Sequence, residues 1–121
     1  MKPDFSGVYV LNRPASELSA AGAASVDSAR VQIEHQEPRF RSQFTYVFAN
    51  GQTFEGSFDL RADEGPALRW DGDALVFTHN SDGTTMTFRY ELIGPGGRLR
   101  MSEELRGTDH DQDNIWIFER Q

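Results

Sequence analysis

The side chain best placed to do chemistry in this sequence is Glu103, which lies between Met101 and Leu105 in an apolar register. Side chains of a strand point alternately to opposite faces, so Glu103 is expected on the dry face and Ser102 and Glu104 on the wet one. Desolvation disfavours the charged form of a carboxyl group, and a carboxyl group in an apolar site therefore suits a general acid or base. The structural alternative is that Glu103 pairs with a basic group or lies at an open rim.

Two histidines and two tyrosines are the other candidates for chemistry. His35 shares the apolar face of its strand, so it is either a proton-transfer or ligand-contacting group or a core histidine with satisfied hydrogen bonds. His79 ends a predicted strand and is expected at the rim. Tyr46 and Tyr90 each carry an apolar ring with one polar tip. They could orient an oxygen of a ligand, or simply bond to each other or to water.

Aromatic residues crowd the middle of the chain, where they suit half-buried pleated surfaces. Most of them are expected to form the core, because aromatic side chains bury large areas. If the interior is open, those expected to contact a ligand beside the two tyrosines are Phe44, Phe58, Trp70 and Phe88, together with His79 at the rim.

The acidic segment from Asp109 to Asp113 begins like a calcium loop, with Asp at alternate positions. However, the position that requires Gly is Asn114, and the twelfth position is Arg120 rather than Glu. A solvated acidic turn is the favoured interpretation. The sequence has neither a phosphate-binding Gly loop nor a Gly-x-Ser-x-Gly nucleophile motif, so no metal and no cofactor is predicted.

Length and charge limit the function classes. The chain has 121 residues, which suits one domain spanning residues 1–121. Its 12 Lys and Arg against 19 Asp and Glu give a net charge of −7, which argues against nucleic acid or an anionic membrane as partner. No apolar run approaches the roughly 20 residues of a spanning helix, and the N-terminus lacks a signal-peptide core. A cytoplasmic monomer or homodimer without disulfides is expected, although a trimmed secreted form would look the same.

Alternation of apolar and polar residues predicts the elements that position these side chains. From Thr53 to Leu60, for instance, every even position is apolar or Gly. Asn50-Gly51 is a strong hairpin signal, and the small, Ala-rich segment from Ala15 to Ala24 suggests one short helix or lid. The predicted strands are Phe5–Asn12, Ala29–Gln36, Arg39–Ala49, Gln52–Arg61, Leu68–Trp70, Ala74–His79, Thr84–Ile93, Arg98–Arg106 and Asn114–Arg120.

So many consecutive amphipathic hairpins must hide a continuous apolar face, and closing the sheet on itself does so. We therefore expect an all-β fold, an antiparallel up-and-down β-barrel of about eight to ten strands with one short N-terminal helix or lid segment. A two-layer sandwich would show the same period.

Several short segments carry a resemblance to a known family. The opening strand Phe5–Asn12 resembles the G-x-W strand of lipocalins and fatty-acid-binding proteins. The corner Ile33–Pro38, the hairpin Trp70–Phe77 and the closing strand Ile115–Arg120 are similar to bacterial lipocalin-like domains of the calycin superfamily. The resemblance covers nearly the whole chain, and it implies a barrel that holds a small molecule.

The resemblance also implies a basic residue stacked on the aromatic of the first strand. Here the aromatic is Tyr9 instead of Trp, and Arg120 is its candidate cation–π partner. Fatty-acid-binding proteins hold the carboxylate of their ligand with an Arg-x-Tyr pair on the last strand. That motif is missing from Trp116–Arg120, so a fatty-acid specificity does not carry over.

Three functions remain open at this point. The first is binding of a small hydrophobic or aromatic molecule inside the barrel. The alternative is a cofactor-independent isomerase, cyclase or lyase that uses Glu103 and His35 as acid and base. The third is an acidic protein-interaction module with a filled barrel. An open interior reached by both Glu103 and His35 would favour the enzyme.

Overall fold

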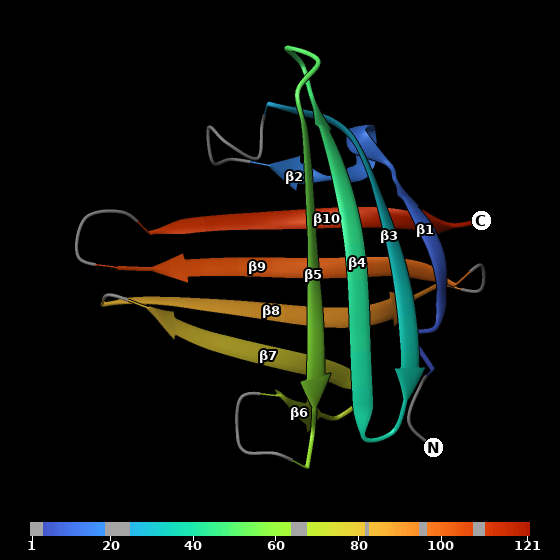
Figure 1. The fold of residues 1–121 in the computed structure, drawn as a ribbon, viewed down its shortest axis with the longest axis vertical. Coiled ribbons are helices and arrows are strands. Elements are labelled where there is room, and N and C mark those ends of the chain that lie inside the picture. The colour runs from blue at the N-terminus through green and yellow to red at the C-terminus, as the bar shows by residue number, and fades with distance from the viewer. Residues whose placement is uncertain (1–3, 19–24, 64–67, 82, 95–96, 108–110) are drawn as a thin grey trace.

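The structure, a computed structural model, describes residues 4–18, 25–63, 68–81, 83–94, 97–107 and 111–121. Within them the chain forms ten strands and a single turn of 3₁₀ helix, Arg13–Ala15 (Figure 1). The strands are β1 Gly7–Leu11, β2 Glu17–Leu18, β3 Val26–Gln36, β4 Arg39–Phe48, β5 Thr53–Arg61, β6 Leu68–Asp71, β7 Ala74–Ser81, β8 Thr84–Ile93, β9 Arg98–Arg106 and β10 Gln112–Arg120. No described helix has the length and apolar character needed to cross a membrane.

The alternation of apolar and polar residues produces these strands. In β3, Ala29, Val31, Ile33 and His35 are buried while every residue between them is exposed. The predicted bounds of β8 and β9 are confirmed, and those of the other long strands differ by up to three residues at an end. Gly51, with a φ of +88°, completes the predicted turn between β4 and β5.

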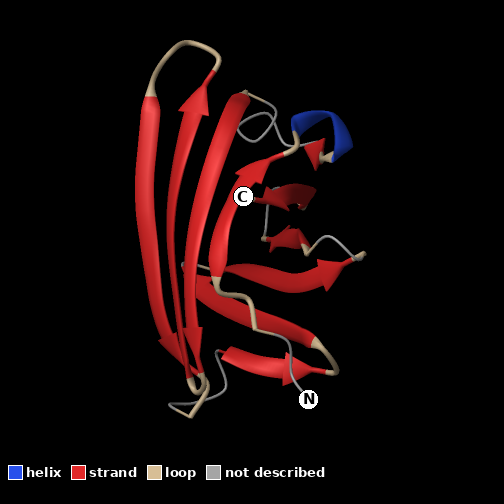
Figure 2. Ribbon diagram, turned by 90° about the vertical axis from the view of Figure 1, so that its right-hand side faces the viewer, coloured by secondary structure: helices blue, strands red, loops and turns tan. Residues whose placement is uncertain are grey.

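All pairings along the sheet are antiparallel, and the strand order is β5-β4-β3-β1-β10-β9-β8-β7-β6, with β2 added to β10. The sheet curls so that β3, β4 and β5 form one layer, which crosses in front of a second layer formed by β7 to β10 (Figures 1 and 2). The all-β, up-and-down architecture is as expected. It is a curled half-barrel, because β5 and β6 are the two edges of the described sheet.

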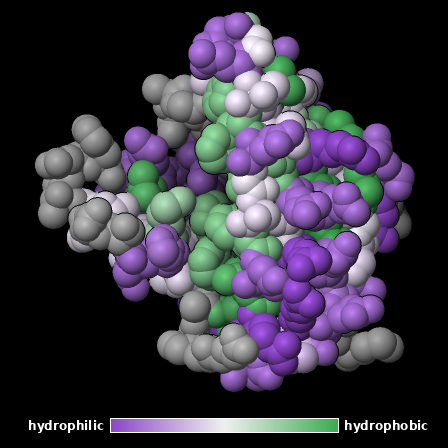
Figure 3. Space-filling model, in the orientation of Figure 1, coloured by the Kyte–Doolittle hydropathy of each residue, from purple (hydrophilic) through white to green (hydrophobic). Residues whose placement is uncertain are grey.

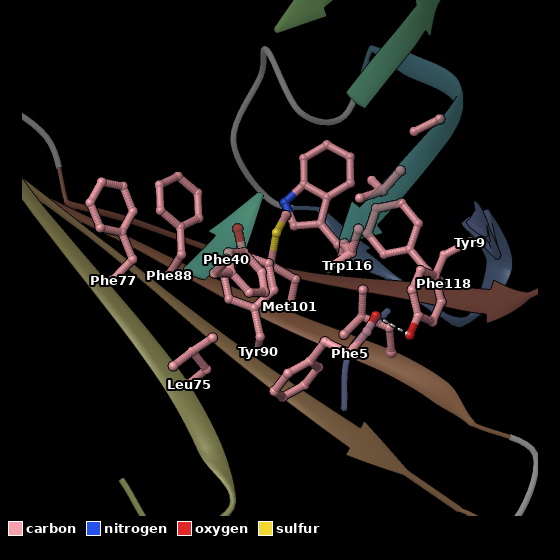
Figure 4. Packing of buried hydrophobic residues seen from close by; sticks show 14 of the residues in the cluster. Phe5, Tyr9, Phe40, Leu75, Phe77, Phe88, Tyr90, Met101, Trp116 and Phe118 are labelled. Atoms are coloured by element: carbon pink, nitrogen blue, oxygen red, sulfur yellow. Dashed lines mark hydrogen bonds between the residues drawn. The ribbon is translucent and has the colours of Figure 1, made fainter. Parts of the chain in front are cut away.

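Side chains, rather than backbone hydrogen bonds, join the two layers on the open side. The ring of Phe58 on β5 lies 5.5 Å from that of Phe77 on β7 and 6.0 Å from that of Phe88 on β8. Phe77 and Phe88 themselves lie side by side with nearly parallel rings (Figure 4). Such aromatic contacts stabilise the packed layers without requiring a continuous ladder.

The described part of the predicted helix or lid is mostly extended. Only Ala15 is helical, as the last residue of the 3₁₀ turn, and β2 begins two residues later at Glu17. The Ser16 hydroxyl donates to the Asn12 carbonyl (2.8 Å) and accepts from the backbone N–H of Ile117 (2.9 Å), which binds this segment to β10. Pairing with β10 therefore outweighs the weak local helix propensity. Residues 19–24 of the predicted lid lie outside the described residues.

Tyr9 on the first strand and Arg120 at the end of the last strand meet beside Phe5, at what we call the deep end of the half-barrel. The Arg120 guanidinium lies 5.4 Å from the centroid of the Tyr9 ring and donates to the Tyr9 hydroxyl at 2.8 Å. That hydroxyl in turn donates to the carbonyl of Phe5 at 2.7 Å (Figure 4). The expected cation–π pair is confirmed, and it closes the deep end beneath the apolar interior.

Candidate functional site

An apolar cavity opens between the two layers and has two connected parts, which we call the inner and outer chambers. The inner chamber has a volume of about 260 Å³ and the outer chamber about 380 Å³. Tyr46, Phe54, Met86 and Glu103 line both. On the face shown in Figure 3, apolar surface forms a band beside the polar surface. Chambers of this size suit a small molecule.

Aromatic rings form much of the wall. Tyr46 on β4 stacks on Trp116 on β10, with centroids 5.4 Å apart and planes inclined by 8°. Phe44, two residues before Tyr46 on β4, stacks on the Tyr46 ring with centroids 5.2 Å apart. Phe54 at the start of β5 is 53% exposed, which is exceptional for a large apolar residue in the described chain. The cavity therefore has a stacked aromatic wall and an aromatic residue at its mouth.

Glu103 is the acidic residue that faces both chambers. It is half-buried on β9, directly opposite Asn114 on β10. Its Oε1 accepts hydrogen bonds from Asn114 Nδ2 at 3.0 Å and from Trp116 Nε1 at 3.3 Å. Within the described chain no donor reaches Oε2, and the lining of both chambers contains no Lys, Arg or His.

Three hydroxyl groups add polar character to the wall. Ser42, Tyr46 and Tyr90 line the inner chamber, and among the described residues none of their side chains makes a hydrogen bond. Burial, followed by the charge of Glu103, raises the pKa of Tyr46 well above its ordinary value. Burial also raises the pKa of Tyr90, with Tyr46 and Glu103 as smaller causes. Both tyrosines are thus neutral donors with unused hydrogen-bonding capacity.

The structure does not bring His35 together with Glu103. His35 lies at the deep end, where Nδ1 accepts from the backbone N–H of Phe5 at 3.2 Å and Nε2 lies 2.9 Å from Glu37 Oε1. Its ring packs 5.7 Å from that of Trp70. Neither His35 nor Trp70 lines the inner or the outer chamber. The hydrogen bonds and ring contacts of His35 match the interpretation of a satisfied core histidine.

The remaining predicted residues divide in the same way. Phe44, Phe58 and Phe88 line the inner chamber. His79 is exposed near the end of β7, outside the described lining. The lining residues that sequence reasoning did not assign to the site include Phe54, Met86, Asn114 and Trp116. The alternation of β10 contained a signal for the last two, because Asn114 and Trp116 share a face with buried Phe118.

The structure describes only part of the acidic segment that was predicted as a solvated turn. Residues 108–110 lie outside the described residues, and Asp111 is exposed. Among the described residues no group of three or more His, Asp or Glu side chains could hold a metal ion.

A curled antiparallel sheet whose two layers enclose an apolar cavity is the lipocalin-like, calycin fold. In agreement with this, the structure resembles the crystal structure of the wild-type fluorescent protein UnaG with a TM-score of 0.61. The match covers 97% of each chain at 15% sequence identity. No protein-family model and no curated protein matches the sequence. At this identity the likeness establishes the fold alone, and the expected lipocalin-like fold is confirmed.

Proposed function

We propose that the protein binds a small, mostly apolar and aromatic molecule between the two layers of the half-barrel. The observation that carries the proposal is the two-chamber cavity with its aromatic wall and open mouth. Stacking surfaces such as Tyr46 and Trp116 favour a planar ligand, and Phe54 is placed to cover it.

The polar groups of the cavity support binding over catalysis. Specific binding needs an apolar cavity with a few polar contacts, and Glu103, Tyr46, Tyr90 and Ser42 supply them. Acid–base catalysis by Glu103 with His35 would need both groups at one substrate, whereas His35 is engaged by Phe5 and Glu37 at the deep end. A filled interaction barrel is disfavoured by the volume of the two chambers.

The proposal is tested by titrating the protein with naphthylmethanol, a neutral bicyclic probe. A Trp70→Phe background leaves Trp116 in the cavity wall as the only fluorescent indole. We expect saturable quenching of Trp116 fluorescence with a single stoichiometric site. Quenching that rises linearly without saturation would contradict an enclosed binding site.

Phe54→Ala in the same background tests the location of the site. Removal of the Phe54 ring should lower affinity by about tenfold, corresponding to about 1.4 kcal/mol. The loss of stability should be small, because Phe54 is already half exposed. The matched control is Ser57→Ala, on the outward face of the same strand, which should leave affinity unchanged. Equal affinities in the two variants would place the probe elsewhere.

A further inference from the structure

We propose that the ligand carries a protonated nitrogen, and that this organic cation binds at Glu103 while its apolar body occupies the two chambers. The inference rests on the proposed binding function and specifies the ligand class. The observation that carries it is the Glu103 carboxylate, which faces an aromatic cavity without a basic residue among its described lining.

The charge balance of the cavity is the first argument. Glu103 faces both chambers, and no Lys, Arg or His lies among their described lining residues. Asn114 and Trp116 both donate hydrogen bonds to Oε1 of Glu103, whereas Oε2 accepts none within the described chain. A ligand that fills the cavity strips water from this oxygen, and a carboxylate without a partner is costly to desolvate. A cationic N–H group on the ligand removes that cost by pairing with Oε2.

The aromatic rings around Glu103 are the second argument. Trp116 Nε1 lies 3.3 Å from Glu103 Oε1, so a group bound to the carboxylate lies next to the indole. Tyr46 stacks on the same indole and also lines both chambers. Aromatic faces attract cations, most strongly where water is excluded. The rings and the carboxylate therefore favour the same ligand charge.

The same groups oppose anions. A fatty-acid carboxylate in the cavity would meet Glu103, and like charges in a partly desolvated site repel. The net charge of −7 adds an attraction for cations at longer range. Neutral ligands lack the repulsion but leave Oε2 unpaired.

Three probes of equal shape separate these cases on the unmodified protein. Naphthylmethylamine is cationic near neutral pH, naphthylmethanol is neutral, and naphthoate is anionic. We expect the amine to bind at least tenfold more tightly than the alcohol, and naphthoate to bind most weakly. Equal binding of amine and alcohol, or tightest binding of naphthoate, would overturn the inference while leaving the binding function in place. If none of the three binds, the binding function fails as well.

Glu103→Gln assigns the preference to one residue. The amide keeps the size of the side chain and removes its charge, so the amine should lose at least tenfold in affinity while the alcohol changes little. Glu104→Gln is the matched control, because Glu104 neighbours Glu103 and is exposed on the opposite face of β9. It removes the same net charge and should leave the amine preference intact. A preference that survives Glu103→Gln, or falls equally in both variants, would refute the role of Glu103.

Discussion

Two N–H donors and a single carboxylate oxygen define the polar centre of the cavity. Asn114 lies opposite Glu103 in the β9–β10 pairing, and Trp116 follows two residues later on the same face. Both donors therefore come from rigid strand positions rather than from loops. This arrangement holds Glu103 in one orientation before any ligand arrives, which lowers the entropy lost on binding.

Burial of Tyr46 and Tyr90 has a measurable consequence for stability at high pH. In the unfolded chain a tyrosine loses its proton near pH 10, whereas in the folded protein the pKa of both is raised, chiefly by burial. As pH rises from about 10 toward the higher folded values, the unfolded state binds fewer protons, and stability falls by up to about 1.4 kcal/mol per pH unit for each tyrosine.

Urea unfolding between about pH 9 and pH 11 checks this expectation. Tyr90→Phe should make the loss of stability with pH shallower, because one of the two titrations is removed. Tyrosinate absorbance of the folded protein provides an independent readout. Stability that is constant over this range, or an unchanged slope in Tyr90→Phe, would contradict the argument.

At the scale of elements, β4 and β5 shape the cavity through a glycine. Gly56 on β5 is paired with Phe44 on β4, and the Phe44 ring occupies the space above it. A Cβ at Gly56 would lie 2.5 Å from Phe44 Cζ, so the ring would have to move. Its backbone does not have a positive φ, and the close approach of the ring is the reason that glycine is required here.

Gly56→Ala should therefore displace Phe44 and lower the unfolding free energy by about 1 to 3 kcal/mol, as overpacking does. Probe affinity should fall too, because Phe44 lines the inner chamber. Adding Phe44→Leu should recover part of the lost stability by relieving the contact. Chemical denaturation of the single and double variants measures both effects. A neutral Gly56→Ala substitution would show that the ring moves without cost.

The sequence could predict elements better than their closure. Alternation is local, so β8 and β9 were predicted with their observed bounds, and the inward phase of Glu103, Tyr46 and Tyr90 followed from it. Pairing of β5 with β6 would depend on contacts between distant parts of the chain, and the alternation of apolar and polar residues along each strand does not predict such contacts. The two-residue strand β2 depends on pairing with β10, which no local pattern in its Ala-rich surroundings indicates.

The same limit explains the outcome for the candidate site. His35 and Glu103 each share the apolar face of their strand, and alternation along a strand therefore predicts that both point inward. Their separation depends on where each lies along the axis of the half-barrel. His35 occurs at the end of β3 beside Phe5, whereas Glu103 lies nearer the mouth with Gln112 and Leu105. The alternation of a strand therefore predicts which face a side chain points to, but not its position along the half-barrel, and for that reason His35 and Glu103 were grouped although the fold separates them.

At the scale of the whole molecule, the cavity is shared between two layers, and in the described sheet β1 is the strand that pairs with both of them. Tyr46 and Phe54 belong to the front layer, while Glu103 and Trp116 belong to the back layer. On the open side the layers meet through side chains, as Phe58 does with Phe77 and Phe88. A ligand in the cavity therefore adds contacts between the two layers where the backbone provides none.

A bound probe should consequently stabilise both layers at once. At a free concentration 100 times Kd, binding to the folded state alone contributes about 2.7 kcal/mol. For a domain of this size that corresponds to a rise in Tm of roughly 10 °C. Hydrogen exchange should slow in β4 as well as in β10, because Tyr46 on β4 and Trp116 on β10 both line the outer chamber. Protection confined to β10 and its neighbours would mean that the ligand lies on one layer only, and the two-layer site would then be wrong.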